Sequence, residues 1–281
     1  VKAAGEEAMK KGIVIAYDSR RKSPEFAQEA ASTFAKNGIQ AYLYEEPRTT
    51  PQLSYSVREL GAFMGIVVTA SHNPPEYNGY KVYGEDGAQL NIEDAEAVIE
   101  YVQQVGDELA IETGNTEEYL QNGLIQVIGH DLDKAYLERV ASIQHQQEFS
   151  GKDSLKVVFS PLHGASGSTV RQLMKQTGYQ NFMYVEDQME PNGEFPTLKS
   201  PNPEEAGAFE LAMKLGKETA ADILITADPD GDRVGLAVRQ GEDYVLLTGN
   251  QTGAILIEYL LTQLKEKGQM PANGRVFKTI V

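Results

Sequence analysis

The chain has 281 residues and no cysteine, which excludes disulfide bonds and thiolate chemistry. Its 25 basic and 41 acidic residues give a formal net charge of −16, so at long range the surface repels nucleic acid and anionic membranes. No signal peptide or long apolar span is visible in the sequence. We therefore expect a cytoplasmic protein of about two domains, with no nucleic-acid or membrane partner.

Expected strands and helices alternate in the first part of the chain. We expect strands at 12–17, 39–44 and 65–68 and helices at 23–38 and 50–61. Pro24 and Pro51 stand at the first helical positions, and Gly38 and Gly61 end the helices. This β-α-β-α-β order predicts a largely parallel sheet with right-handed crossovers.

The rest of the chain repeats this alternation. Residues 82–90 are expected to form a strand and a turn, and 107–123 a polar surface segment. We expect further helices at 92–105, 132–146, 204–219 and 251–267. We expect further strands at 155–159, 182–185, 222–227, 233–238, 244–247 and 276–281. The pattern predicts an α/β protein of repeated domains, each with a mixed, largely parallel sheet flanked by helices: 1–150, 151–248 and the start of a third at 249–281.

The loop after the strand expected at 65–68 carries the first group of reactive side chains. It reads Thr-Ala-Ser-His-Asn-Pro from Thr69 and, after Pro75 and Glu76, continues as Tyr-Asn-Gly-Tyr-Lys to Lys81. The strand delivers Ser71 to its C-terminal end, where open α/β sheets bind ligands, and the prolines stiffen the loop. A hydroxyl, the imidazole of His72 and the ammonium of Lys81 could therefore serve phosphoryl transfer. The alternative is an ordinary polar loop, because adjacent Ser and His do not by themselves form a nucleophile–base pair.

A second loop follows the strand expected at 222–227 and reads Asp-Pro-Asp-Gly-Asp-Arg. Its carboxylates at Asp228, Asp230 and Asp232 repel one another unless a cation lies between them, and hard oxygen ligands suit Mg²⁺. An EF-hand is excluded, because Arg233 stands where that loop needs glycine and Arg239 where it needs a bidentate glutamate. The alternative is an acidic turn without a metal.

Together the two loops resemble those of the α-D-phosphohexomutases, the phosphoglucomutase/phosphomannomutase superfamily, and are most similar to the phosphoglucomutase branch. The resemblance implies a phosphate on Ser71, and one Mg²⁺ held by Asp228, Asp230, Asp232 and a phosphoserine oxygen. It places Arg233 beside the phosphoryl group. It implies an isomerase that interconverts hexose 1-phosphate and 6-phosphate, with a sugar bisphosphate as intermediate and activator. His72 and Lys81 are alternative candidates for general acid/base catalysis.

Other polar residues are weaker candidates. Arg20 follows the first strand, so it could be a phosphate or charge partner in the same crevice as Ser71, or a solvated loop arginine. The resemblance implies an arginine at this place in the active site. Arg48 stands at the end of the second strand. The glycine-containing loop at 160–167 could form a tight turn or contact an anion directly. His130 and His145 have no cluster of ligand-type neighbours, so we expect surface histidines.

The resemblance spans essentially the whole chain, yet the family has four domains. We therefore expect an N-terminal portion of a longer protein, one that folds but is inactive alone. The sequence contains no Gly-Glu-x-Ser-Gly string, which the family uses to grip sugar hydroxyls. A phosphomannomutase or phosphopentomutase is an alternative within the family. Two alternatives lie outside the family. One is a haloacid-dehalogenase-type phosphatase with Asp228 as nucleophile, and the other is a non-catalytic sugar-phosphate binder.

Overall fold

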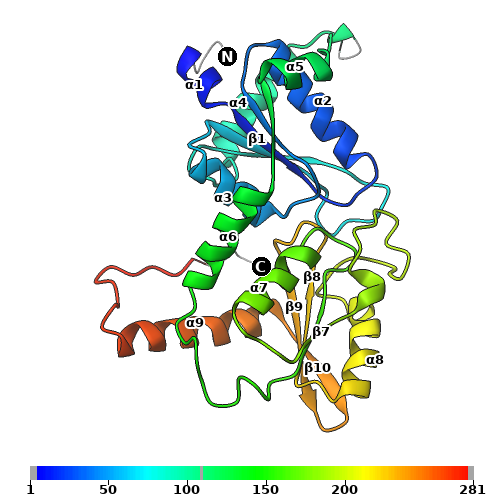
Figure 1. Cartoon of the computed structure of the whole chain (residues 1–281), viewed down its shortest axis with the longest axis vertical. Helices are drawn as coiled ribbons and strands as arrows, with labels where there is room; N and C mark the ends of the chain where they lie inside the picture. Colours follow the sequence, from blue (N-terminus) through cyan, green and yellow to red (C-terminus); the bar gives the residue numbers. More distant parts are fainter. Residues whose placement is uncertain (1–4, 108–109, 278–281) are drawn as a thin grey trace.

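The first sheet forms one end of the molecule (Figure 1). In the computed structural model, which describes residues 5–107 and 110–277, this sheet has five strands in the order β4-β3-β1-β2-β5. The strands are β1 (Ile13–Tyr17), β2 (Ala41–Tyr44), β3 (Met64–Val68), β4 (Tyr80–Tyr83) and β5 (Ile125–Ile128). All pairs are parallel except β3 with β4, so the sheet is mixed but largely parallel.

Helices cover both faces of this sheet. Alternate residues of β1 point to opposite faces, and all of them are buried because each face is covered. On one face, Ile13 and Ile15 of β1 pack with small residues of α2 (Ser23–Lys36). On the other, Val14 and Ala16 pack with Leu53 of α3 (Thr50–Glu59). The remaining helices are α1 (Gly5–Lys11), α4 (Ile92–Gln103), α5 (Thr116–Asn122) and α6 (His130–Ser142).

The second sheet has the order β10-β9-β8-β6-β7. Its strands are β6 (Val157–Ser160), β7 (Phe182–Tyr184), β8 (Ile223–Ala227), β9 (Val234–Gln240) and β10 (Asp243–Leu247). Strand β6 pairs in parallel with β7 and β8, whereas β9 and β10 add antiparallel pairs. The helices are α7 (Gly167–Gln176), α8 (Glu210–Thr219) and α9 (Gly249–Glu266), with short 3₁₀ turns at Glu186–Gln188 and Ala206–Phe209.

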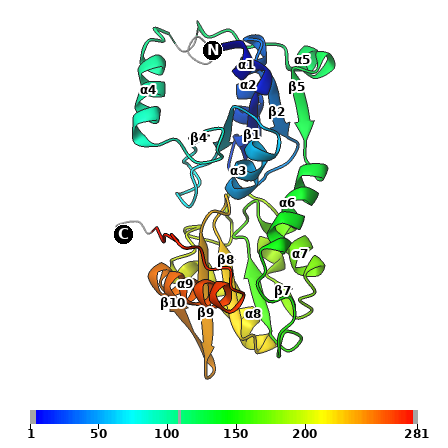
Figure 2. The same cartoon turned by 90° about the vertical axis from the view of Figure 1, so that its left-hand side faces the viewer.

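The two sheets follow one another along the long axis of the molecule, and α6 runs beside their junction (Figures 1 and 2). Helix α6 contacts α3 of the first sheet and α7 of the second. The carboxyl ends of β3 and β8 meet at this junction, because the loops that follow them are hydrogen-bonded to each other. None of the helices in the described residues combines the length and the apolar character needed to cross a membrane.

The predicted α/β class, with helices flanking two mixed and largely parallel sheets, is confirmed. Several local expectations were wrong. The segment at 107–123 is mostly exposed where it is described, as expected, but it contains the unexpected α5, and the unexpected β5 follows it as an edge strand. The helix expected at 204–219 begins only at Glu210, after the prolines and a 3₁₀ turn. Val276 and Phe277 are not in a strand, and the rest of the strand expected at 276–281 lies outside the described residues.

Candidate active site

The serine loop, residues 69–79, begins where β3 ends. Ser71 adopts a left-handed backbone conformation with φ of 53°, which costs a residue with a side chain about 1–2 kcal/mol. The loop holds it there, because the Ser71 N–H donates to Thr69 Oγ1 at 2.8 Å. Gly79 passes so close that an added Cβ would lie 2.6 Å from the Thr69 carbonyl oxygen. The backbone strain therefore lies at the residue that the resemblance predicts to carry phosphate, and such strain is common at functional sites.

Arg20 fixes this loop through its backbone. Its guanidinium donates to the carbonyl oxygens of Ser71, Asn73, Pro74 and Tyr77. The residue is only 1% exposed. Arg20 thus lies in the same region as Ser71, as predicted, but its hydrogen-bond donors are directed at the loop's main chain.

Asp18 is a buried partner that our sequence reasoning missed. It lies 3.3 Å from Arg20 Nε, and it accepts hydrogen bonds from the Thr69 hydroxyl, the Ser23 hydroxyl and the Arg20 N–H. Burial raises the pKa of Asp18 to about 6, against the lowering effect of these hydrogen bonds and of the Arg20 guanidinium. The sequence feature that could have indicated Asp18 is its position directly after β1, two residues before Arg20. Asp18 and Arg20 together form a buried charged support for the serine loop.

The acid loop, residues 228–233, follows β8. One carboxylate oxygen from each of Asp228, Asp230 and Asp232 lies within 4.8 Å of the others. Asp228 and Asp230 are fully buried. Burial and the neighbouring carboxylates raise the pKa of Asp228 to about 8. Gly231 takes a positive φ of 66°, which lets the loop turn so tightly that the three side chains converge.

The geometry of Asp230 fits a bound cation. Its Oδ2 accepts hydrogen bonds, whereas its Oδ1 is buried and has no hydrogen-bond partner among the described residues. A buried, unpaired carboxylate oxygen is costly, and a divalent cation with oxygen ligands would compensate for it. The acid loop can therefore hold a metal of the hard, oxygen-preferring type.

Side chains of the serine loop and β4 reach the acid loop across the junction of the two sheets. The Ser71 hydroxyl donates to Asp228 Oδ2 at 2.7 Å. Lys81 Nζ donates to Asp230 Oδ2 at 2.8 Å and to Asp232 Oδ2 at 3.1 Å. The structure thus brings together residues that the sequence placed in two separate motifs.

His72 and Lys81 differ in their surroundings. His72 Nδ1 lies 3.3 Å from Ser71 Oγ, and burial together with the Arg233 guanidinium lowers the pKa of His72. Burial also lowers the pKa of Lys81, but the charges of Asp230 and Asp232 outweigh this effect and raise it overall. Arg233 is exposed, and within the part of the chain that the structure describes its guanidinium has no hydrogen-bond or ion-pair partner.

Comparison with known proteins gives the same two-part organisation. The family model for domain I of phosphoglucomutase/phosphomannomutase, an alpha/beta/alpha domain, matches residues 1–108. The model for the alpha/beta/alpha domain II matches residues 134–241. The chain belongs to the phosphoglucomutase/phosphomannomutase family. The serine loop lies in the segment matched by the first model, and the acid loop in the segment matched by the second.

Individual members of the phosphoglucomutase/phosphomannomutase family are similar over most of the chain. A phosphoglucomutase of Staphylococcus saprophyticus is 38% identical over 255 residues, which cover 90% of this chain and 46% of the relative. A phosphoglucomutase of Staphylococcus aureus strain N315 is 39% identical and is covered to 45%. A crystal structure of a putative phosphomannomutase from Thermus thermophilus has a TM-score of 0.75 at 25% identity, with 89% and 53% of the two chains covered. The chain thus spans less than half the length of these curated relatives.

The glycine-containing loop at 160–167 forms a tight turn that supports the acid loop. The Ala165 N–H donates to the Pro229 carbonyl oxygen at 2.8 Å. A Cβ on Gly164 would lie 2.5 Å from Pro229 Cα, so only glycine allows this approach. The buried His163 pairs through Nε2 with the Thr197 hydroxyl at 2.9 Å. Of the two interpretations of this loop, its contacts favour the turn.

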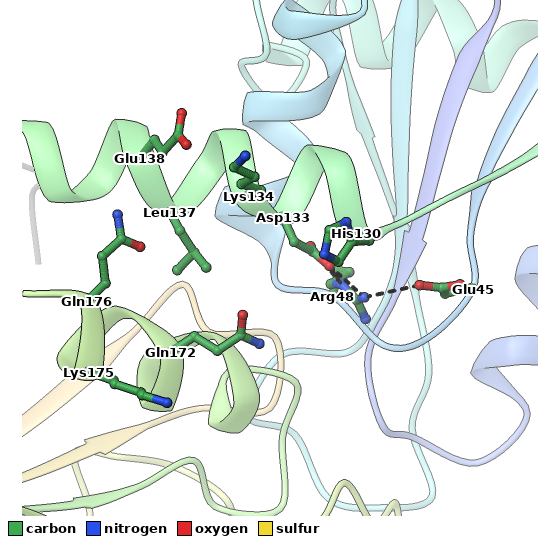
Figure 3. Close-up of a pocket in the computed structure, with 10 residues that line it drawn as sticks. All are labelled: Glu45, Arg48, His130, Asp133, Lys134, Leu137, Glu138, Gln172, Lys175 and Gln176. Carbon is green, nitrogen blue, oxygen red and sulfur yellow. Dashed lines mark hydrogen bonds and ion pairs between the residues drawn. The ribbon is translucent and has the colours of Figure 1, made fainter.

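The weaker polar candidates lie elsewhere. A cavity of about 800 Å³ lies between α6 and α7, and Figure 3 shows Arg48 and His130 among the residues that line it. Ser71, Lys81 and the residues of the acid loop do not line it. Arg48 is tied to Asp133 by two-pronged hydrogen bonds, so it braces α6 and does not reach Ser71. His130 is exposed, as expected. His145 packs its ring edge-on to Tyr259.

Proposed function

We propose that the complete protein is a phosphosugar mutase that interconverts hexose 1-phosphate and hexose 6-phosphate, with glucose as the first candidate sugar. The observation that carries this proposal is the 2.7 Å contact between the Ser71 hydroxyl and Asp228 within a cluster of three carboxylates. The serine is a candidate phosphate carrier, and the carboxylates are candidate ligands of one Mg²⁺.

In the proposed reaction the phosphoryl group moves from phosphorylated Ser71 to a free sugar hydroxyl. The P–O bond to Ser71 Oγ breaks as a new one forms to the sugar oxygen, whose proton passes to a base. The base delivers this proton to the freed Ser71 oxygen. The sugar bisphosphate then turns over, and its other phosphoryl group passes to Ser71 Oγ as its P–O bond to the sugar breaks, while the Ser71 proton passes through a base to the freed sugar oxygen. Mg²⁺, when bound, supplies charge neutralisation for the transferred group. Arg233 supplies a second positive charge.

Two side chains are candidates for the proton transfers. Lys81 reaches the acid loop from β4, and His72 lies 3.3 Å from Ser71 Oγ. A base must be within hydrogen-bond reach of the proton that it takes up, or reach it through one water. The activities of Lys81→Met and His72→Asn in the full-length enzyme would be compared. The residue whose substitution causes the larger loss of turnover would be assigned the proton transfer.

The assignment of separate roles to separate parts of the chain belongs to the proposal. Residues 1–150 form the phosphoserine domain, 151–248 the metal-binding domain, and 249–281 the start of a third domain. Residues that grip the sugar and its distal phosphate would lie in the rest of the protein. Because this binding energy orients the bisphosphate, we expect the 281-residue chain alone to have little or no mutase activity.

The phosphoserine is tested directly in the full-length protein. Peptide mapping is expected to find phosphate on Ser71, and Ser71→Ala is expected to lower turnover of glucose 1-phosphate about a thousand-fold or more. Ser54→Ala is the matched control, since its hydroxyl bonds the Gly87 carbonyl oxygen outside the site. Full activity of Ser71→Ala would overturn the mechanism. Assays on mannose, glucosamine and pentose 1-phosphates would identify a phosphomannomutase or phosphopentomutase instead.

The competing phosphatase chemistry predicts a different covalent species. A haloacid-dehalogenase-type reaction would place the phosphoryl group on Asp228 as an acyl phosphate, which acid and hydroxylamine cleave, whereas phosphoserine survives acid. We expect acid-stable phosphate on Ser71. Acid-labile phosphate on Asp228 would favour the phosphatase, and phosphate on neither residue would favour a non-catalytic sugar-phosphate binder.

A further inference from the structure

The N-terminus of α3 is attached to the acid loop. Thr49 caps the helix through a reciprocal pair of contacts with Gln52, so Thr50 begins the helix in a fixed position. The Thr50 N–H donates to the Asp230 carbonyl oxygen at 2.8 Å, and its hydroxyl donates to Asp230 Oδ2 at 3.0 Å. A residue of the first sheet's helix layer thus holds both the backbone and the side chain of a candidate metal ligand in the second.

These contacts determine which oxygen of Asp230 remains available. Its Oδ2 is engaged by the Thr50 hydroxyl and by Lys81, whereas its buried Oδ1 has no hydrogen-bond partner among the described residues. Without the hydroxyl, rotation of the carboxylate could exchange the two oxygens. The Thr50 hydroxyl therefore holds Asp230 in the rotamer that leaves Oδ1 buried and unpaired, and so available to a cation.

We propose that Thr50 is a positioning residue for a divalent cation in the acid loop, so that cation affinity depends on the contact between the two sheets. The proposal rests on the metal site of the proposed function and names a residue that does not itself ligate the metal. Lys81 cannot serve equally well, because its positive charge opposes a cation beside it. Thr50 is neutral, and α3 packs directly on β1 and β3, the strand that carries Ser71.

The size of the expected effect follows from the behaviour of outer-shell hydrogen bonds in metal sites. Loss of such a partner typically weakens metal binding by about 10–100-fold. Thr50→Val removes the hydroxyl and keeps the shape of the side chain, whereas Thr50→Ser keeps the hydroxyl. The valine variant is expected to bind Mg²⁺ about 10–100-fold more weakly than the unsubstituted chain, and the serine variant within about threefold of it.

The experiment titrates the chain with Mg²⁺ alone by calorimetry and with Mn²⁺ alone by electron paramagnetic resonance. Melting temperatures in chelator and in excess Mg²⁺ separate folding from metal binding. Ser56→Ala is the matched control, because it removes another buried hydroxyl of α3, one that bonds Tyr44 and does not approach the acid loop. We expect this control to lower both melting temperatures equally and to leave the affinity unchanged.

The outcomes are distinguishable. If the unsubstituted chain binds Mg²⁺, and Asp230→Ala loses it, but Thr50→Val binds with unchanged affinity, the positioning role is overturned and the metal site stands. If the unsubstituted chain binds neither ion, the metal site and the positioning role fall together. Should Thr50→Val not fold, Thr50→Ala is measured in its place, and retained affinity there overturns the inference in the same way.

Discussion

The two sheets share one strand arrangement but carry different polar side chains in their equivalent loops. In each, the first strand lies between the second and the third, and an antiparallel strand follows the third: β1, β2, β3 and β4 correspond to β6, β7, β8 and β9. The serine loop joins β3 to β4, and the acid loop joins β8 to β9. The two loops of the candidate site therefore occupy equivalent positions, one in each sheet.

The two sheets differ in how the loop after the first strand supports the loop after the third strand. After β1, Arg20 holds the serine loop with a charged side chain that donates to four carbonyl oxygens. After β6, Ala165 and Gly164 hold the acid loop by a backbone hydrogen bond and close backbone contact. The guanidinium can brace the serine loop because it binds main-chain oxygens, which leaves the Ser71 hydroxyl to donate to Asp228. The backbone support of the acid loop occupies none of its carboxylate oxygens.

The largest expected effect tests the charged support. Arg20→Met removes the ion-pair partner of buried Asp18 and four hydrogen bonds to the serine loop. Breaking a buried pair by removing one partner typically costs about 3–5 kcal/mol of unfolding free energy. Urea unfolding monitored by circular dichroism measures this loss of unfolding free energy. Arg21→Met is the control, because Arg21 pairs with Glu194 at the surface, where an ion pair contributes about 0–1 kcal/mol. Equal small losses in both variants would refute the structural role of Arg20.

A smaller effect is expected from the backbone support. In Gly164→Ala the added Cβ would approach Pro229 Cα to 2.5 Å and the Pro229 carbonyl oxygen to 2.6 Å. Such overpacking costs about 1–3 kcal/mol, and the displaced acid loop should also bind Mg²⁺ more weakly. Gly253→Ala in α9 is the control, since nothing lies within 4 Å of its added Cβ. That helical substitution should stabilise the chain by about 0.5–1 kcal/mol. A Gly164→Ala protein of unchanged stability would contradict the close-contact account.

The smallest effect concerns pH. Burial lowers the pKa of His163 below its usual 6.5, so the unfolded chain takes up this proton more readily than the folded chain. The stability contributed by neutral His163 is therefore fully present above pH 6.5 and is lost as the pH falls towards the folded-state pKa. Urea unfolding at about pH 7.5 and at about pH 5.5 measures how much unfolding free energy is lost as the pH falls. This loss should be smaller for His163→Asn than for the parent. His130→Asn, at an exposed site, should behave like the parent, and identical losses in all three proteins would argue against the effect.

Sequence reasoning succeeded where short-range patterns decide the structure. The buried β-branched strands and the proline and glycine boundaries predicted most elements, and two uninterrupted motifs predicted the residues that meet at the junction. It failed at β5, whose four residues follow a polar segment and pair with β2 from a distant part of the chain. It also missed the contacts of Asp18 with Thr69 and of Thr50 with Asp230, because these residues lie 51 and 180 positions apart along the chain. The role of Arg20 depends on the same kind of long-range contact, so its neighbourhood could be predicted but its partners could not.

The contacts that unite the two loops also have a kinetic meaning. The hydrogen bonds from Ser71, Lys81 and Thr50 to the acid loop join residues 157, 149 and 180 positions apart. Closing such long loops carries an entropic cost that grows with loop length, whereas each sheet is built mainly from segments that are nearer along the chain. Assembly of the site should therefore be a late step of folding, when two preformed sheets dock. During synthesis, Ser71 leaves the ribosome long before Asp228 exists to accept its hydrogen bond, so the serine loop first emerges without the carboxylates that later surround it.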